Sequence, residues 1–265
     1  MRFWMAISFV VALVTCSAMA KDAPLRGLHS ESEATAWRAV GRLNIGSSSF
    51  CTGTLIASDI VLTAGHCLFD KATGTRVSDS DIEFLAGWRS GRASAHRTVR
   101  RALVHPDFAF DTEFSTGVMI NDLALLELEY PILDEQIAPF ATAERPRRGA
   151  QVGVVSYGAG RSEAPALQET CRVLAQQNGV LVTSCTVDFG SSGAPIFVIN
   201  GGVPQIVSIV SAKAEVEGEA VSLGTSLGRP LVQLQEALLV EQFALRPRLR
   251  AGQISNQSSA TFVKP

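Results

Sequence analysis

The sequence predicts an all-β protein, and three observations support this prediction. Short apolar runs alternate with turn residues along most of the chain. Glycine occurs 22 times among the 265 residues, which favours many tight turns. Asn200 and Gly201 stand between two apolar runs and indicate a β-hairpin whose central residues adopt positive φ. About a dozen strands at this spacing fit a β-sandwich or β-barrels.

The composition excludes other classes of protein. With 46% hydrophobic and 18% charged residues, the chain can form an apolar core and is not expected to be disordered. The formal net charge is −2 and the pI is about 6.1, so no basic surface for nucleic acid is expected. The length fits one large domain or two fused small ones.

The N-terminus has the pattern of an export signal. Arg2 is the only charged residue before Lys21, residues 3–14 are apolar except for Ser8, and small residues occupy positions 18 and 20. We predict a signal peptide at 1–20 and a secreted or periplasmic protein, without stable membrane insertion after signal removal. A membrane-anchoring helix and a lipoprotein signal ending at Cys16 are the alternatives.

The remaining cysteines are Cys51, Cys67, Cys171 and Cys185. An even number in an exported chain indicates two disulfides. Of three possible pairings, sequence order favours Cys51 with Cys67 and Cys171 with Cys185. Zinc is the competing interpretation, but no Cys-x-x-Cys or His-Glu-x-x-His motif occurs. We therefore expect no metal and no organic cofactor.

The first half of the mature chain predicts an arm and then a β unit. Residues 21–36 are polar and without pattern, and form an N-terminal arm or a propeptide. The first unit covers residues 37–130. Its apolar runs predict strands at 39–43, 53–56, 60–63, 82–86, 98–104 and 123–128.

Residues 131–149 contain prolines and a charged run, and are predicted to link the first unit to a second one at 150–243. Strands are predicted there at 151–156, 171–175, 180–183, 195–199 and 206–211.

A C-terminal helix is predicted at 230–243. Pro230 occupies a position that the first turn of a helix tolerates, and Leu231, Leu234 and Leu238 share one face. We expect this helix to pack on the second unit, and the polar residues 244–265 to form a flexible tail.

His66 is the first of three candidate chemical groups. It follows an apolar strand and directly precedes Cys67, so a disulfide from Cys51 would hold its backbone rigidly. A general base needs rigidity because it acts only within about 0.5 Å of its productive position.

Asp122 is the second candidate, at the head of the apolar run 123–126. Burying a carboxylate among leucines is costly unless it is hydrogen-bonded, and an imidazole N–H is a suitable partner. Alternatively, Asp122 caps a turn before the strand.

Ser192 is the third candidate, flanked by glycines in the segment 188–195. Glycines allow a sharp turn from which the Ser192 hydroxyl projects, while the N–H groups of Gly190 and Ser192 point into one cavity. That geometry makes an oxyanion hole. The alternative is an ordinary Gly/Ser-rich loop.

Together, the segments 63–67, 122–126 and 190–195, in the order His, Asp, Ser, resemble the trypsin-like serine proteases of the chymotrypsin fold. Supporting matches lie at 50–56, at His105-Pro106 and at 155–158. The resemblance spans about residues 37–243.

This resemblance implies two antiparallel six-stranded β-barrels, with the active site in the cleft between them. It implies a secreted endopeptidase that hydrolyses polypeptides through an acyl-enzyme intermediate. His66 takes the Ser192 proton and returns it to the leaving amine, while Asp122 fixes the tautomer. The Gly190 and Ser192 amides hold the oxyanion, and Ser211 aligns with a family serine that supports the aspartate.

Ser191 departs from the animal members of this family. Those enzymes have there an aspartate that receives a freed N-terminal amine, and no Ile-Val-Gly-Gly-like start precedes Trp37. Activation by that ion pair is therefore not expected. The Gly-Ser-Ser-Gly motif is similar to that of secreted bacterial members related to the glutamyl endopeptidases.

The family resemblance also assigns Thr186, Ser211 and Lys213 to the substrate pocket. Thr186 stands at the pocket base, where an acidic residue would favour Lys or Arg, although Asp188 lies nearby. Lys213 falls near the pocket wall, where it would attract an acidic side chain or narrow the entrance. Val210 replaces the histidine that glutamyl-specific relatives carry.

Two other functions compete with this interpretation. An α/β-hydrolase esterase needs its histidine after the nucleophile, and no histidine follows His105. A catalytically inactive protease homologue that acts as a binding module is the alternative, although such proteins typically lose a triad member. The sequence leaves the oligomeric state open.

Overall fold

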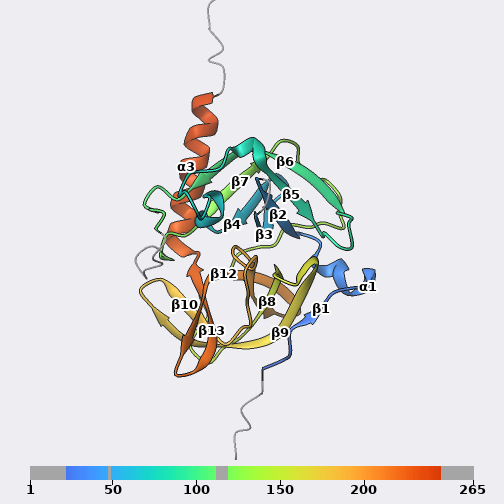
Figure 1. Ribbon diagram of the computed structural model, residues 1–265, viewed down its shortest axis with the longest axis vertical. Helices are drawn as coiled ribbons and strands as arrows, with labels where there is room; N and C mark the ends of the chain where they lie inside the picture. The colour runs from blue at the N-terminus through green and yellow to red at the C-terminus, as the bar shows by residue number, and fades with distance from the viewer. Residues whose placement is uncertain (1–21, 47–48, 112–118, 246–265) are drawn as a thin grey trace, which may run out of the picture.

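A computed structural model describes residues 22–46, 49–111 and 119–245 of the protein (Figure 1). It contains two β units and a C-terminal helix, which confirms the predicted all-β class with one helix at the end. The predicted signal peptide lies outside the described residues, as does most of the predicted tail at 244–265. Residues 244 and 245 were wrongly assigned to that tail, because they form the last part of the C-terminal helix.

Six antiparallel strands close the first barrel in the order β2-β3-β4-β7-β6-β5. Alternate residues of these strands point inward, so that Leu43, Leu55 and Leu62 are fully buried. The bounds are β2 (Val40–Ile45), β3 (Ser49–Ala57), β4 (Ile60–Thr63), β5 (Ile82–Ala86), β6 (Ala95–Val104) and β7 (Ala124–Leu128).

The second unit forms the second barrel, a ring of antiparallel pairings in the order β8-β9-β10-β13-β12-β11, which the pairing of β11 with β8 closes. The Cys171–Cys185 disulfide lies in its core beside Val152 and Leu181. The bounds are β8 (Gln151–Gly158), β9 (Arg161–Gln177), β10 (Val180–Thr183), β11 (Pro195–Asn200), β12 (Val203–Val216) and β13 (Glu219–Ser226).

The N-terminal arm has structure that its polar sequence did not suggest. Strand β1 (Arg26–Gly27) pairs with β9 through backbone hydrogen bonds, which need no side-chain pattern. Helix α1 (Glu31–Ala34) follows, with Ser30 and Glu33 forming a capping box, and then a 3-10 helix, η1 (Thr35–Trp37). The spacing of Ser30 and Glu33 is a helix-start signal that could have been read from the sequence.

Two predicted strands of the second unit were much too short and one strand was missed, whereas the prediction at 180–183 matches β10. The predictions at 171–175 and 206–211 are parts of the longer β9 and β12, and β13 was not predicted. The far ends of β12 and β13 form an exposed hairpin, where Val216 pairs with Glu219. Backbone pairing rather than burial holds such ends, so they leave no apolar pattern.

The predicted hairpin between β11 and β12 is confirmed, but its turn lies one residue later. Asn200 pairs with Val203, and the central residues are Gly201 (φ 58°) and Gly202 (φ 85°). Both central positions require positive φ, and two glycines supply it without steric cost.

Aromatic side chains join the two barrels. Trp37 comes from the segment before the first barrel, Phe140 from the linker and Phe197 from β11. The Phe197 ring centroid lies 5.1 Å from that of Trp37 and 4.8 Å from that of Phe140, distances at which aromatic pairs attract. This cluster fixes one barrel on the other.

Helix α3 (Gly228–Leu245) packs on β6 and β7 of the first barrel, not on the second unit as expected (Figure 1). The predicted apolar face is confirmed, because Leu231, Leu234 and Leu238 are buried. They belong to an apolar cluster that contains the core of the first barrel together with residues of the second unit such as Phe197. Burial of this face therefore holds the helix against the first barrel.

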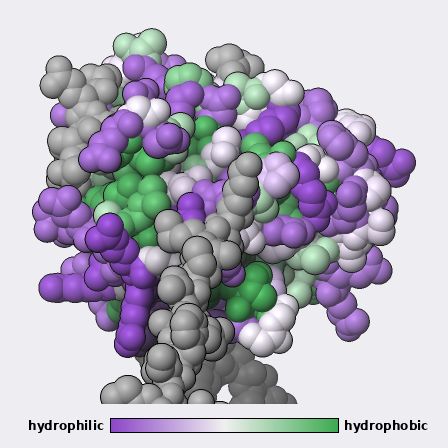
Figure 2. All heavy atoms as spheres, turned by 90° about the horizontal axis from the view of Figure 1, so that it is seen from below, coloured by the Kyte–Doolittle hydropathy of each residue, from purple (hydrophilic) through white to green (hydrophobic). Residues whose placement is uncertain are grey.

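Hydrophilic side chains cover most of the face seen in Figure 2, and apolar side chains form separated areas on it. Within the described ranges, no helix has the length and apolar character needed to span a membrane.

Replacing Leu234 by Ala should lower the free energy of unfolding by about 2–5 kcal/mol, because it leaves a cavity at a fully buried site. Urea unfolding followed by tryptophan fluorescence measures this change. Leu239→Ala is the control, since Leu239 lies on the same helix and is 52% exposed. Equal losses in the two variants would contradict the packing of this face.

Candidate active site

His66 and Asp122 lie at the same end of two neighbouring strands, one just after β4 and the other just before β7. Strand β4 ends at Thr63, which pairs with Ala124 at the start of β7. His66 follows on a 3-10 helix, η2 (Gly65–Leu68), and Asp122 stands two residues before β7. Antiparallel pairing therefore brings together two residues that are 56 positions apart in the sequence.

Two hydrogen bonds join this pair. The imidazole Nδ1 of His66 lies 2.8 Å from Oδ2 of Asp122, and the backbone N–H of His66 donates to Oδ1 at 2.8 Å. Asp122 is 0% exposed and His66 is 3% exposed. Because a carboxylate only accepts hydrogen bonds, we assign the proton to Nδ1, which leaves Nε2 as the basic nitrogen of the ring.

Ser211 supplies a third donor to Asp122, from the second barrel. Its hydroxyl donates to Oδ2. The pairing of β12 with β13 shifts between Val210 and Ala212, so Ser211 is the extra residue of a β-bulge. A bulge turns a side chain out of the regular alternation, and here the hydroxyl meets the carboxylate.

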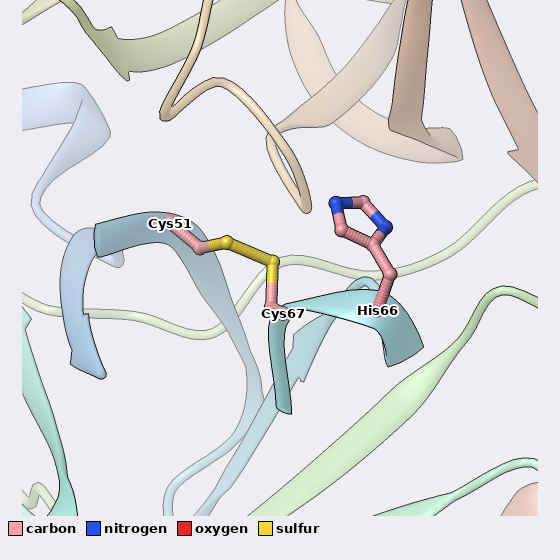
Figure 3. A group of neighbouring side chains, drawn as sticks. All are labelled: Cys51, His66 and Cys67. Carbon is pink, nitrogen blue, oxygen red and sulfur yellow. A yellow bond between two sulfur atoms is a disulfide. The ribbon is translucent and has the colours of Figure 1, made fainter. Parts of the chain in front are cut away.

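The disulfide between Cys51 and Cys67 joins β3 to η2, the short helix that carries His66 (Figure 3). Cys51, His66 and Cys67 are also the one group of metal-ligand types that lie close together in the described part of the chain. Both sulfurs are bonded to each other and Nδ1 faces Asp122, so these residues do not suit a metal ion.

Ser192 is half-buried on a turn between two glycines. Gly190 has φ 91° and Gly193 has φ 77°, a backbone region that glycine adopts readily. The carbonyl of Ser192 accepts from the amide of Thr52 at 2.9 Å, and Gly193 N–H donates to Val210 O at 2.7 Å. Among the described residues, no hydrogen bond uses the amide of Gly190 or Ser192.

A pocket of about 330 Å³ brings several predicted residues together. Its lining comprises His66, Lys71, Val187, Asp188, Phe189, Ser192, Val210, Ser211, Ala212 and Lys213. Thr186 and Gly190 are not in this lining. Thr186 is exposed, and its amide donates to Oε1 of Gln168 at 2.7 Å.

Charged and aromatic groups meet at one side of the pocket. The ammonium of Lys213 donates to Oδ1 of Asp188 at 2.9 Å and lies 4.4 Å from the ring centroid of Phe189. This hydrogen bond from Lys213, together with the Phe189 amide, lowers the pKa of Asp188. Lys71 lies 5.6 Å from the same ring.

Lys71 and Phe189 were not predicted as pocket residues. Lys71 stands in the loop after η2, where no motif marks it. Phe189 lies inside the predicted segment 188–195, and its place next to Gly190 was an available signal, whereas its 65% exposure is seen only in the structure.

The Gly193→Ala variant should be less stable than the Gly218→Ala variant by about 1–3 kcal/mol. Both glycines have positive φ, at 77° and 84°, so both substitutions strain the backbone. Only at Gly193 would the added Cβ clash, 2.2 Å from Thr63 Oγ1 and 2.3 Å from Thr52 O. Urea unfolding measures the difference, and equal stabilities would show that the turn is not tightly enclosed.

Comparison with known proteins supplies curated relatives of part of the chain. Mannan-binding lectin serine protease 1 of Homo sapiens is 29% identical over 146 residues, which are 50% of this chain and 20% of that protein. Trypsin of Phaedon cochleariae is 33% identical over 117 residues, which are 42% of this chain and 41% of that protein. The chain therefore matches less than half the length of these curated relatives.

Solved structures share the fold. A Glu endopeptidase in complex with MPD superposes with a TM-score of 0.64 at 16% identity, covering 84% of this chain and 99% of that one. A thermostable serine protease, AL20, has a TM-score of 0.61 at 20% identity, with 77% and 98% covered. A family profile described as Trypsin matches residues 28–225. This chain belongs to the trypsin family of serine proteases.

Proposed function

We propose that the protein is a secreted or periplasmic serine endopeptidase that hydrolyses polypeptides through an acyl-enzyme intermediate. The observation that carries this proposal is the buried His66–Asp122 pair beside a pocket that His66 and Ser192 both line. Ser192 is the nucleophile, His66 the general base and acid, and Asp122 the residue that orients the imidazole.

In the first step, His66 Nε2 takes the hydroxyl proton of Ser192 as its oxygen attacks the scissile carbonyl. The imidazolium then returns that proton to the leaving amine, and water repeats the sequence on the acyl-enzyme. Asp122 stabilises the imidazolium, and its three hydrogen bonds hold its carboxylate in place.

The tetrahedral intermediate places a negative charge on the former carbonyl oxygen. We assign its stabilisation to the amides of Gly190 and Ser192, which no hydrogen bond within the described residues engages. Each donor of this kind contributes about 3–4 kcal/mol to transition-state stabilisation.

Export agrees with the two disulfides, which persist in oxidising compartments. We place the protein near the secreted bacterial branch related to the glutamyl endopeptidases, because Ser191 stands in a Gly-Ser-Ser-Gly motif. Animal and insect proteins are among the relatives reported above, so the motif alone supports this placement.

The pocket favours an acidic residue of the substrate over a basic one. The pocket lining contains two ammonium groups, of Lys71 and Lys213, and one carboxylate, of Asp188. Lys213 already donates a hydrogen bond to Asp188. A second anionic group entering from the substrate would meet the remaining positive charge of Lys71 and the exposed side of Lys213, whose side chain is 50% exposed.

Replacing Ser192 by Ala should abolish peptide hydrolysis and labelling by a fluorophosphonate, because the nucleophilic oxygen is removed. Proteolysis of casein and gel detection of the labelled protein measure both. Ser80→Ala, a change on an exposed surface, is the control. If the wild-type protein shows neither activity while folded, the binding-module alternative holds instead.

The Lys213→Met variant should lose preference for Asp or Glu before the cut, while keeping hydrolysis of neutral peptides. A peptide library digested by each protein and read by mass spectrometry gives the preference. Arg148→Met, which removes an exposed charge outside the pocket, is the control. An unchanged profile in Lys213→Met would contradict the role given to this lysine.

A further inference from the structure

The hydroxyl of Ser191 is buried and fully engaged. Ser191 is 0% exposed, and its hydroxyl donates to the carbonyl of Tyr157 at 2.9 Å. The same oxygen accepts from Nη2 of Arg161 at 2.9 Å and from the amide of Asp188 at 3.2 Å. A residue next to the proposed nucleophile is thus held mainly by the hairpin of β8 and β9, since Tyr157 lies near the end of β8 and Arg161 begins β9.

Arg161 makes further bonds within that hairpin, to Ser156 of β8. Its guanidinium donates to the carbonyl of Ser156, and to the Ser156 hydroxyl at 3.1 Å. Burial lowers the pKa of Arg161, and the nearby Asp188 carboxylate opposes this shift. A planar guanidinium with several fixed donors holds two acceptors at a set separation better than a flexible ammonium does.

The turn between β8 and β9 orients the peptide group that carries the Gly190 amide. Ala159 N–H donates to the carbonyl of Phe189 at 2.7 Å. In a planar trans peptide the C=O and the following N–H point in opposite directions. Fixing the Phe189 carbonyl therefore directs the Gly190 N–H away from the turn.

Thr52 of the first barrel also holds the β8–β9 hairpin and the loop that carries Ser192. Its hydroxyl accepts from the amide of Tyr157 at 3.1 Å and donates to the carbonyl of Gly190 at 2.9 Å. The turn and the nucleophile loop are therefore joined through one buried threonine.

We propose that Arg161 is a positioning residue that holds loop 188–192 in its oxyanion-binding conformation through Ser191. This inference rests on the proposed endopeptidase function. In animal members of the family, an ion pair between a freed N-terminal amine and an aspartate stands at this position. Here the hydrogen bond from Arg161 to Ser191, within the second barrel, would take the place of that ion pair. Asp22 and Arg26 lie against β9 instead, since Asp22 pairs with Arg172 at 3.4 Å and Arg26 is in register with Leu167.

Arg161→Met should lower kcat about 10- to 100-fold with KM unchanged, because misplacement of the oxyanion donors weakens transition-state binding only. Steady-state hydrolysis of a fluorogenic peptide chosen from the wild-type library digest measures both constants, and thermal unfolding verifies the fold. Arg148→Met is the matched control, an exposed arginine in the linker. A kcat equal to that of the control, or a change confined to KM, would overturn the proposal.

Ser191→Ala provides a second route, which keeps Arg161 in place and applies if Arg161→Met does not fold. It should lower kcat to a similar extent, and the double variant should lose little more than either single one, because both remove the same contact. Losses that multiply in the double variant, or wild-type kcat in Ser191→Ala, would overturn the proposal. Wild-type hydrolysis that Ser192→Ala abolishes is measured alongside, so that a failure of the proposed function is seen separately.

Discussion

The buried carboxylate of Asp122 is the constraint on which the site depends. An ionised group without solvent is tolerated only where hydrogen bonds replace its water. Two of its donors come from His66 in the first barrel, and the third comes from Ser211 in the second. Satisfying this one side chain therefore requires both barrels to be docked, and docking brings the imidazole to the pocket.

The first barrel also serves as a scaffold for the loop of the second. Thr52 lies beside the Cys51–Cys67 disulfide, and its amide, hydroxyl and carbonyl are all engaged, the carbonyl by the Thr63 hydroxyl at 2.9 Å. A cross-link next to these bonds limits the movement of the strand that makes them. Reacting groups hold their geometry when the residues around them are fixed in this way.

Much of this arrangement could be predicted from the sequence, because its signals are local. The glycines around Ser192, the adjacent His66-Cys67 and the leucines of α3 are each short-range patterns, and the structure gives them the expected conformation, cross-link and burial.

Other features depend on contacts between distant segments. The bulge at Ser211 arises from the register of two strands, and the bond of Arg161 to Ser191 joins residues 30 positions apart. The family resemblance placed Thr186 at the base of the substrate pocket, whereas the structure leaves Thr186 exposed and outside the lining of the pocket beside His66 and Ser192. No local pattern in the sequence carries this information.

The pairing of β1 with β9 has a consequence for the wall of the second barrel. Leu28 N–H donates to Pro165 O and Ala23 N–H donates to Thr170 O, each at 2.8 Å. The arm thereby covers a stretch of β9 whose other side is paired with β8. Removal of the arm would leave backbone N–H and C=O groups of β9 unpaired. Unpaired groups along a strand edge can form hydrogen bonds with strands of neighbouring molecules. The arm thus satisfies the hydrogen-bonding groups of this edge from within the chain itself.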